Sequence, residues 1–94
     1  MAKLSYSERA VFDLARLAEF SDEIGESGTR VIDLITAAIQ MLAEHPHVGR
    51  NVDDYLSELV ISRGRTGYVA MYRFDLDEDV VRILAIRHQR EAGY

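Results

Sequence analysis

The chain has 94 residues, of which 48% are hydrophobic and 29% are charged, a composition typical of one ordinary globular domain. It contains no cysteine, which excludes a disulfide framework, a thiolate metal site and a cysteine nucleophile. Its net charge of −5 argues against a protein whose main role is to bind a phosphate backbone, because that affinity comes from lysine and arginine.

The charge is unevenly distributed along the chain. Residues 1–46 carry four basic and eight acidic side chains, whereas residues 47–94 carry seven arginines and eight acids. Every basic residue of the second half is therefore arginine, which makes planar, bidentate contacts with carboxylate or phosphate. The second half can still recognise an anion locally.

The first ten residues, MAKLSYSERA, lack the apolar stretch of a signal peptide, and no segment approaches the roughly 18 apolar residues of a membrane span. We therefore expect a cytoplasmic protein that makes no membrane contact.

Residues 3–6 alternate polar and apolar side chains and predict a short strand with Leu4 and Tyr6 on one face. A helix should begin near residues 6–8, because Ser5 and Glu8 have the spacing of a capping box and Ser7 is a competing N-cap. This helix should end between Gly25 and Gly28. Its predicted apolar stripe consists of Val11, Leu14, Ala15, Leu17, Ala18 and Ile24.

A second helix is predicted to start at Ser27 or Thr29 and to stop before Pro46, because a proline disfavours helical geometry in the preceding residue. Its wide stripe implies that it is heavily buried. The stripe consists of Val31, Leu34, Ile35, Ala38, Ile39 and Leu42. Two such helices joined by a glycine-containing turn should form an antiparallel helical hairpin.

Residues 45–54 are predicted to be a connection, residues 55–62 a strand, and residues 63–67 a turn with Arg63 and Arg65 on either side of a glycine. Residues 67–89 hold two runs of strand character joined by the acidic residues 75–79, which predicts a β-hairpin. The fold class is therefore α+β, as a single domain over residues 1–94. A strand and a helical hairpin come first, and the hairpin packs on one face of a small, mainly antiparallel, twisted sheet in the order β-α-α-β-β-β.

Alternation along the two hairpin strands assigns side chains to faces. Both strands are apolar on both faces near their middles, so the helices should cover one face and a partner the other. Strict alternation predicts that the uncovered face exposes four apolar side chains, Val69, Met71, Val81 and Ile83. Such a patch would favour a homodimer or aggregation in isolation.

Several segments together resemble the RelE/ParE superfamily of bacterial type II toxin–antitoxin toxins. They are Ala10, Asp13 and Leu14 in the first helix, Pro46-x-x-Gly49-Arg50, a strand around Leu59, Gly67-Tyr68-x-x-x-Tyr72-Arg73-Phe74-Asp75, and Ile83-Leu84-Ala85-Ile86-Arg87-His88-Gln89-Arg90-Glu91. The resemblance implies a plasmid-stabilisation type of toxin that a cognate antitoxin neutralises. One branch of the family cleaves messenger RNA on the ribosome, and the other poisons DNA gyrase.

The nuclease branch needs a proton acceptor, a cation at the phosphate and an acid for the leaving oxygen. Arg73 and Arg87 match arginines that RelE-like toxins place at the scissile phosphate. Histidine is the side-chain type that exchanges protons near neutral pH, so His88 could move a proton, although alternation points it away from Arg87. Tyr94 could stack or donate a proton, as a C-terminal tyrosine does in some RelE-like enzymes.

Each of these residues also has a structural interpretation. Arg73 could pair with Asp75 or Glu91 at a sheet edge, and His88 could be a partly buried histidine at a strand end. His45 and His47 flank Pro46, but no third ligand lies at a recognisable spacing. We expect neither a metal nor a cofactor.

The single lysine, Lys3, and the acidic charge favour a protein target over ribosomal RNA, and the ending Arg87-His88-Gln89-Arg90-Glu91 looks closer to ParE-like chains. The sequence therefore favours a ParE-like toxin that acts by binding a protein target such as DNA gyrase. A ribosome-dependent endoribonuclease and a non-toxic interaction module with the same fold remain alternatives. The predicted binding residues, for antitoxin or target, are Arg63, Arg65, Val69, Met71, Arg73, Val81, Ile83 and Arg87.

Overall fold

The computed structural model describes residues 1–62 and 67–91. In chain order its elements are β1 (Lys3–Tyr6), α1 (Glu8–Glu23), α2 (Gly28–Gln40), the short 3-10 helix η1 (Met41–Ala43), β2 (Arg50–Asn51), β3 (Ser57–Ile61), β4 (Tyr68–Asp75) and β5 (Val80–His88). The predicted order is confirmed. The two-residue β2 was not predicted, and it lies in the segment expected to be a connection.

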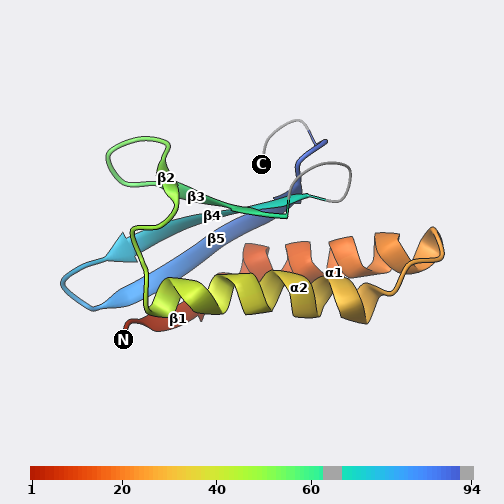
Figure 1. Ribbon diagram of the computed structural model, residues 1–94, viewed down its shortest axis with the longest axis horizontal. Coiled ribbons are helices and arrows are strands. Elements are labelled where there is room, and N and C mark those ends of the chain that lie inside the picture. The colour runs from red at the N-terminus through yellow and green to blue at the C-terminus, as the bar shows by residue number, and fades with distance from the viewer. Residues whose placement is uncertain (63–66, 92–94) are drawn as a thin grey trace.

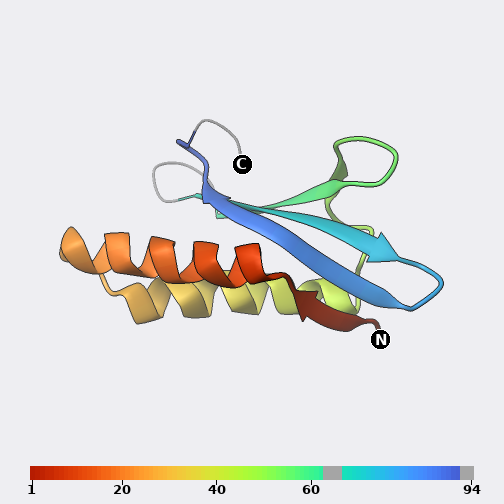
Figure 2. The same ribbon diagram turned by 180° about the vertical axis from the view of Figure 1, so that it is seen from behind.

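The strands form one sheet in the order β1-β5-β4-β3-β2. β1 runs parallel to β5, and every other neighbouring pair is antiparallel. In Figures 1 and 2 both helices lie on the same side of the sheet, and no described helix or strand covers its other side. The predicted α+β architecture is therefore confirmed.

Ser7 begins α1, because its Oγ accepts a hydrogen bond from the Ala10 N–H at 3.0 Å. The alternative cap, Ser5, lies within β1. Ser27 caps α2 in the same way, with its Oγ 3.3 Å from the Arg30 nitrogen. Both helices thus start at a serine whose side chain satisfies a backbone donor that has no partner within the helix.

The buried face of α1 differs from the predicted stripe. Two of the predicted apolar residues, Val11 and Ile24, are each 55% exposed, whereas the polar Asp13 and Ser21 are 4% and 3% exposed. The prediction treated polar residues as surface residues. Asp13 is buried because its carboxylate has a backbone partner in the sheet, so it belongs to the face that packs on the strands.

The second helix follows its prediction more closely. Ile35, Ile39 and Leu42 are fully buried, although Leu34 is 43% exposed. The α-helical part ends at Gln40 and tightens into η1, several residues before Pro46. Pro46 therefore follows the helical segment without directly ending its regular part.

The core lies between the helical hairpin and the sheet. Helix residues pack there against side chains of every long strand. The partly buried Leu4 and Tyr6 of β1 pack against the same cluster, which agrees with the prediction that they share one face. The principal members of this core are Ala10, Leu17, Val31, Ile35, Ile39, Leu42, Leu59, Ile61, Tyr68, Ala70, Tyr72, Val81, Ile83 and Ile86.

A β-bulge in β5 changes which side chains share a face. Met71 pairs with Ala85 and Tyr72 pairs with Ile83, so Leu84 is an additional residue in β5. A bulge of this kind interrupts strict alternation along the strand that contains it.

The predicted faces of β5 are therefore wrong on one side of the bulge. Val81 and Ile83 are fully buried in the same core cluster as Ile86, so the prediction that Val81 and Ile83 lie on the uncovered face is wrong. Beyond the bulge, Arg87 lies on the uncovered face and His88 on the helix side, as the register and the contacts of His88 indicate.

Residues of α1 and its cap hold this bulge. The Ser7 Oγ donates to the Leu84 carbonyl oxygen at 2.9 Å, and the Asp13 Oδ2 accepts from the Ile86 N–H at 2.8 Å. These two backbone groups lie beyond the part of β5 that pairs with β1, and they thus find partners on α1 and its cap. The bulge is therefore part of the contact between α1 and β5.

No helix in the described residues is both long and apolar enough to cross a membrane.

Candidate functional site

The candidate site is the side of the sheet opposite the helices, which we call the uncovered face. The pairing of β3, β4 and β5 places its side chains in three rows. The rows are Val60 with Val69 and Arg87, then Glu58 with Met71 and Ala85, and then Arg73 with Arg82. Arg50 of β2 extends the middle row, because it pairs with Glu58.

Glu58 is the buried acid of this face. Only 7% of the residue is exposed, and its Oε1 accepts from the Arg50 Nη2 at 2.8 Å and from the Arg50 Nε at 3.2 Å. A buried carboxylate needs such charge-assisted partners to offset its lost hydration. Neither residue was predicted to be part of the site, although a charged residue inside the apolar run of residues 57–61 was an available signal.

Arg73 and Arg82 lie directly opposite each other on adjacent strands. The Arg82 Nη2 is 3.6 Å from the Asp75 Oδ2, whereas no ion pair of Arg73 occurs within residues 1–62 and 67–91. Arg73 is exposed. The acids that the sequence offered to Arg73, Asp75 and Glu91, pair with Arg82 and Arg16 instead.

Arg87 lies in the first row and is half-buried. Its Nη1 donates to the carbonyl oxygens of His88, Gln89 and Glu91 at 3.3, 3.3 and 3.2 Å. The guanidinium therefore holds the turn that follows β5. The Arg87 backbone position is about 13 Å along the strands from that of Arg73, since Val69, which pairs with Arg87, is four residues away from Arg73.

His88 lies on the other side of the sheet. Its ring meets Tyr68 edge to face with the centroids 5.3 Å apart, and its Nδ1 accepts from the Arg90 N–H at 3.1 Å. Both rings line a groove of about 820 Å³ beside the end of α1, together with Phe20. The structure therefore separates His88 from Arg73 and Arg87, as alternation predicted for Arg87.

Glu91 connects the end of β5 to α1. Its Oε1 accepts from the His88 N–H at 3.0 Å and from the Arg16 Nη1 at 3.1 Å. Burial acts to raise the pKa of the Glu91 carboxyl, but these two hydrogen bonds and the nearby positive charges outweigh it, so that the pKa lies below its ordinary value of 4.5. This carboxylate stays ionised and fixes the tail against the helix.

The remaining predicted site residues divide into two groups. Val69 is only 4% exposed and Met71 is half-buried, so the uncovered face does not carry the large exposed apolar patch that was predicted. Arg63, Arg65 and Tyr94 lie outside the described residues.

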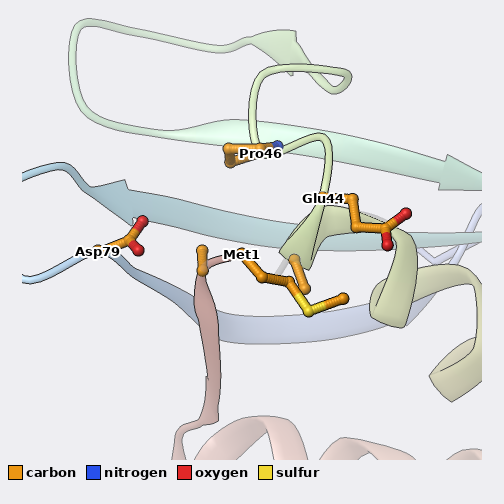
Figure 3. A pocket seen from close by; sticks show the side chains of 6 residues that line it. Met1, Glu44, Pro46 and Asp79 are labelled. Atoms are coloured by element: carbon orange, nitrogen blue, oxygen red, sulfur yellow. The ribbon is translucent and has the colours of Figure 1, made fainter.

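A second hollow of about 410 Å³ lies near the start of the chain and includes Met1, Glu44 and Asp79. In Figure 3 the side chains of Glu44 and Asp79 lie on either side of Met1 and do not converge. His47 contacts the Phe74 ring edge to face, and within the described part of the chain no three potential metal ligands gather.

The arrangement suits binding better than proton transfer. The uncovered face presents arginines around half-buried apolar side chains, and its buried acid is already bonded to Arg50. The candidate proton carrier, His88, faces the helix layer. The structure thus places Arg73 and Arg87 on one side of the sheet and His88 on the other.

The chain matches known proteins over nearly its whole length. The family model for the ParE toxin of the type II toxin–antitoxin system parDE matches residues 4–93. Toxin RelE3 of Caulobacter vibrioides is 35% identical over 92 residues, which is 97% of this chain and 98% of that protein.

Solved structures share the fold. A chain of the intact RelBE toxin–antitoxin complex of E. coli superposes with a TM-score of 0.71 at 15% identity, over 97% of this chain and all of that chain. A chain of the chromosomal ParDE system of P. aeruginosa gives 0.76 at 17% identity, over 94% and 96% of the two chains. The family match and the RelE3 relative place this chain in the ParE toxin family of type II toxin–antitoxin systems, within the RelE/ParE superfamily.

Proposed function

We propose that this toxin stops bacterial growth by binding a protein target in the cytoplasm, such as DNA gyrase, through the uncovered face, and that a cognate antitoxin neutralises it. The proposed contacts on this face are Met71, Arg73 and Arg87, with the buried Val69 beside them in β4. Arg63 and Arg65, which lie outside the described residues, stay proposed contacts from the sequence.

The observation that carries this proposal is that Arg73 and Arg87 lie on the side of the sheet opposite His88. A metal-free ribonuclease needs a proton carrier within hydrogen-bond reach of the group it serves, beside the cation that binds the phosphate. Here Arg73 and Arg87 lie on one face of the sheet and His88 on the other. In addition, the Arg87 guanidinium is hydrogen-bonded to three backbone carbonyls.

Solved relatives support an antitoxin partner. The RelBE chains of E. coli and the ParDE chains of P. aeruginosa come from toxin–antitoxin systems, and the former was solved as the intact complex. A chain with the same fold and family is expected to have an antitoxin of its own.

The alternative is a ribosome-dependent endoribonuclease that uses Arg73, Arg87, His88 and Tyr94. The name of the C. vibrioides relative, Toxin RelE3, favours it. In this case His88 would have to reach the RNA from the helix side of the sheet.

A cell-free translation reaction with purified toxin and a defined message separates the two mechanisms. The proposal predicts that primer extension shows an intact message. The same chain, when expressed in cells without antitoxin, should still stop growth. New 5′ ends at ribosome-bound codons, lost in a His88→Gln variant, would establish the nuclease instead. His88→Gln is informative because substitutions of Arg73 or Arg87 are expected to weaken both mechanisms.

A chain that does not affect growth in the absence of antitoxin would be the non-toxic interaction module. Growth curves after induction of the toxin alone distinguish this outcome before any target is sought.

A further inference from the structure

Two like charges face each other on the uncovered face, where nothing in the fold requires them. Arg73 and Arg82 are directly paired across β4 and β5, an arrangement that destabilises an antiparallel sheet when both residues carry the same charge. Arg73 is exposed. An anion placed between two such guanidinium groups would turn the repulsion into two charge-assisted hydrogen bonds.

The chain already places a carboxylate beside this pair. The Asp75 Oδ2 is 3.6 Å from the Arg82 Nη2, and the Asp75 Oδ1 accepts from the Glu78 N–H at 3.2 Å. Asp75 therefore approaches Arg82 from the acidic turn, and within residues 1–62 and 67–91 it makes no ion pair with Arg73. The distance exceeds that of a good hydrogen bond, so a better-placed carboxylate can compete for Arg82.

The surroundings favour a peptide over a nucleic acid. Among the residues of the strands, the uncovered face carries Arg50, Arg73, Arg82 and Arg87 against the carboxylates of Glu58 and Asp75, while the whole chain has a net charge of −5. A polyanion that extends beyond this small basic area meets repulsion from the rest of the molecule. The half-buried Met71 lies in the next row, which suits a segment that mixes acidic and apolar side chains.

We propose that Arg73 and Arg82 form an arginine clasp that binds an aspartate or glutamate side chain on an acidic, partly apolar segment of a protein partner. The identification of that partner as target or antitoxin rests on the proposed function, but the clasp itself does not.

The test is a fluorescence-anisotropy titration of the purified chain with a labelled short peptide that has glutamate at alternate positions and leucine between them. A matched peptide with glutamine in place of glutamate is the ligand control. We expect the glutamate peptide to bind, with an affinity that falls as salt rises. We expect Arg73→Gln and Arg82→Gln each to weaken binding by about tenfold, the effect of losing one charge-assisted hydrogen bond.

Arg30→Gln is the protein control, because Arg30 is an exposed arginine of α2 on the helix layer and the change removes the same charge. It should leave the affinity unchanged. Equal weakening by Arg30→Gln, equal binding of the glutamine peptide, or no binding of the glutamate peptide would overturn the clasp. A single-stranded RNA that binds more tightly than the peptide and depends on the same two arginines would also overturn it, in favour of a phosphate site.

The Tm of the free protein provides a second readout. If Arg73 had a purely structural role, its substitution would change the Tm in the direction opposite to the one that we expect. Because Arg73 and Arg82 repel each other, Arg73→Gln should raise the Tm of the free chain by about 1–4 °C, and this gain should shrink when Arg82 is already glutamine. A lower Tm for Arg73→Gln would mean that the arginine stabilises the fold, and the proposal would be wrong.

The clasp and the proposed function can fail separately. Loss of peptide binding in both arginine variants together with message cleavage in the translation assay would retain the clasp and reject the protein-target mechanism. An intact message, together with peptide binding that is unchanged in both arginine variants, would retain the protein-target mechanism and reject the clasp.

Discussion

At the residue scale, Asp13 is the side chain that fixes α1 against the sheet. It is 4% exposed, and its Oδ2 accepts from the Ile86 N–H at 2.8 Å. Arg9 and Arg16 lie 3.8 and 3.6 Å from the two carboxylate oxygens. This buried carboxylate, with one backbone donor and two nearby cations, fastens the helix to β5 just beyond the bulge.

We therefore expect Asp13→Ala to lower the free energy of unfolding by about 1–3 kcal/mol, because the Ile86 N–H would be left buried without an acceptor. Asp13→Asn keeps an acceptor oxygen and should cost less. Urea denaturation at pH 7 measures both, with Asp33→Ala on the exposed side of α2 as the control. Equal stability of Asp13→Ala and Asp33→Ala would contradict this role.

The pH dependence of stability tests Glu91. Because its pKa is lower in the folded chain than its ordinary value of 4.5, the unfolded chain binds the proton more readily, and the stabilising contribution is fully present above pH 4.5. It is lost as the pH falls through the lower folded pKa. Thermal unfolding between pH 3 and 7 should therefore show a smaller acid-induced fall for Glu91→Gln than for the wild type, and parallel curves would refute the assignment.

At the element scale, the bulge in β5 determines the site. By adding Leu84 to one strand, it brings Val81, Ile83 and Ile86 into one core and places Arg87 on the opposite face. Ser7 contributes to both sides of this junction, since its Oγ accepts from the Ala10 N–H and donates to the Leu84 carbonyl oxygen. One side chain, Ser7, therefore caps α1 and also binds the bulge of β5.

The two helix caps provide a matched comparison. Ser7→Ala loses a cap and the bond to β5, and we expect it to cost about 1–2 kcal/mol, while Ser27→Ala loses only an exposed cap and should cost about 0.5–1 kcal/mol. The Ser27 cap bond is exposed and its length is 3.3 Å. Chemical denaturation of the two variants gives the difference, and a larger loss for Ser27→Ala would contradict the assigned role of Ser7 in the bulge.

The same elements explain what the sequence could and could not predict. Periodicity and cap residues were sufficient for β1, both helices and the β4–β5 hairpin, because these signals are local. The faces of β5 were not predictable, since nothing in residues 80–88 marks Leu84 as an additional residue. The buried face of α1 was mistaken because the partner of Asp13 is 73 residues away in the chain.

The site shows the same division. Arg73 and Arg87 could be identified as candidates from the sequence, and their common face follows from the register of β4 and β5. Arg82 could not be identified, because its importance comes only from standing opposite Arg73 across the hairpin. Glu58 and Arg50 belong to separate strands, and their pairing depends on β2, which has only two residues.

At the scale of the whole molecule, the helix layer and the uncovered face differ in character. The large apolar side chains of α1 that face solvent include Phe12, 66% exposed, and Phe20, 56% exposed, whereas Val69 of the uncovered face is buried. Self-association of the isolated chain therefore remains a prediction, but the surface expected to cause it is the exposed apolar side of α1 and not the uncovered face.

Light scattering over a range of concentrations tests this prediction. We expect the apparent mass of the isolated chain to rise with concentration, and Phe12→Ser to reduce the rise because it removes exposed apolar surface. Met71→Ser on the uncovered face is the comparison and should have a smaller effect. A constant monomer mass at every concentration would refute self-association.

The central claim is that the uncovered face binds a protein target and performs no RNA cleavage. The most direct measurement is the incorporation of labelled thymidine and labelled amino acids during the first minutes after the toxin is induced without antitoxin. We predict that DNA synthesis falls first while protein synthesis continues. An immediate stop of protein synthesis with ongoing DNA synthesis would contradict the claim.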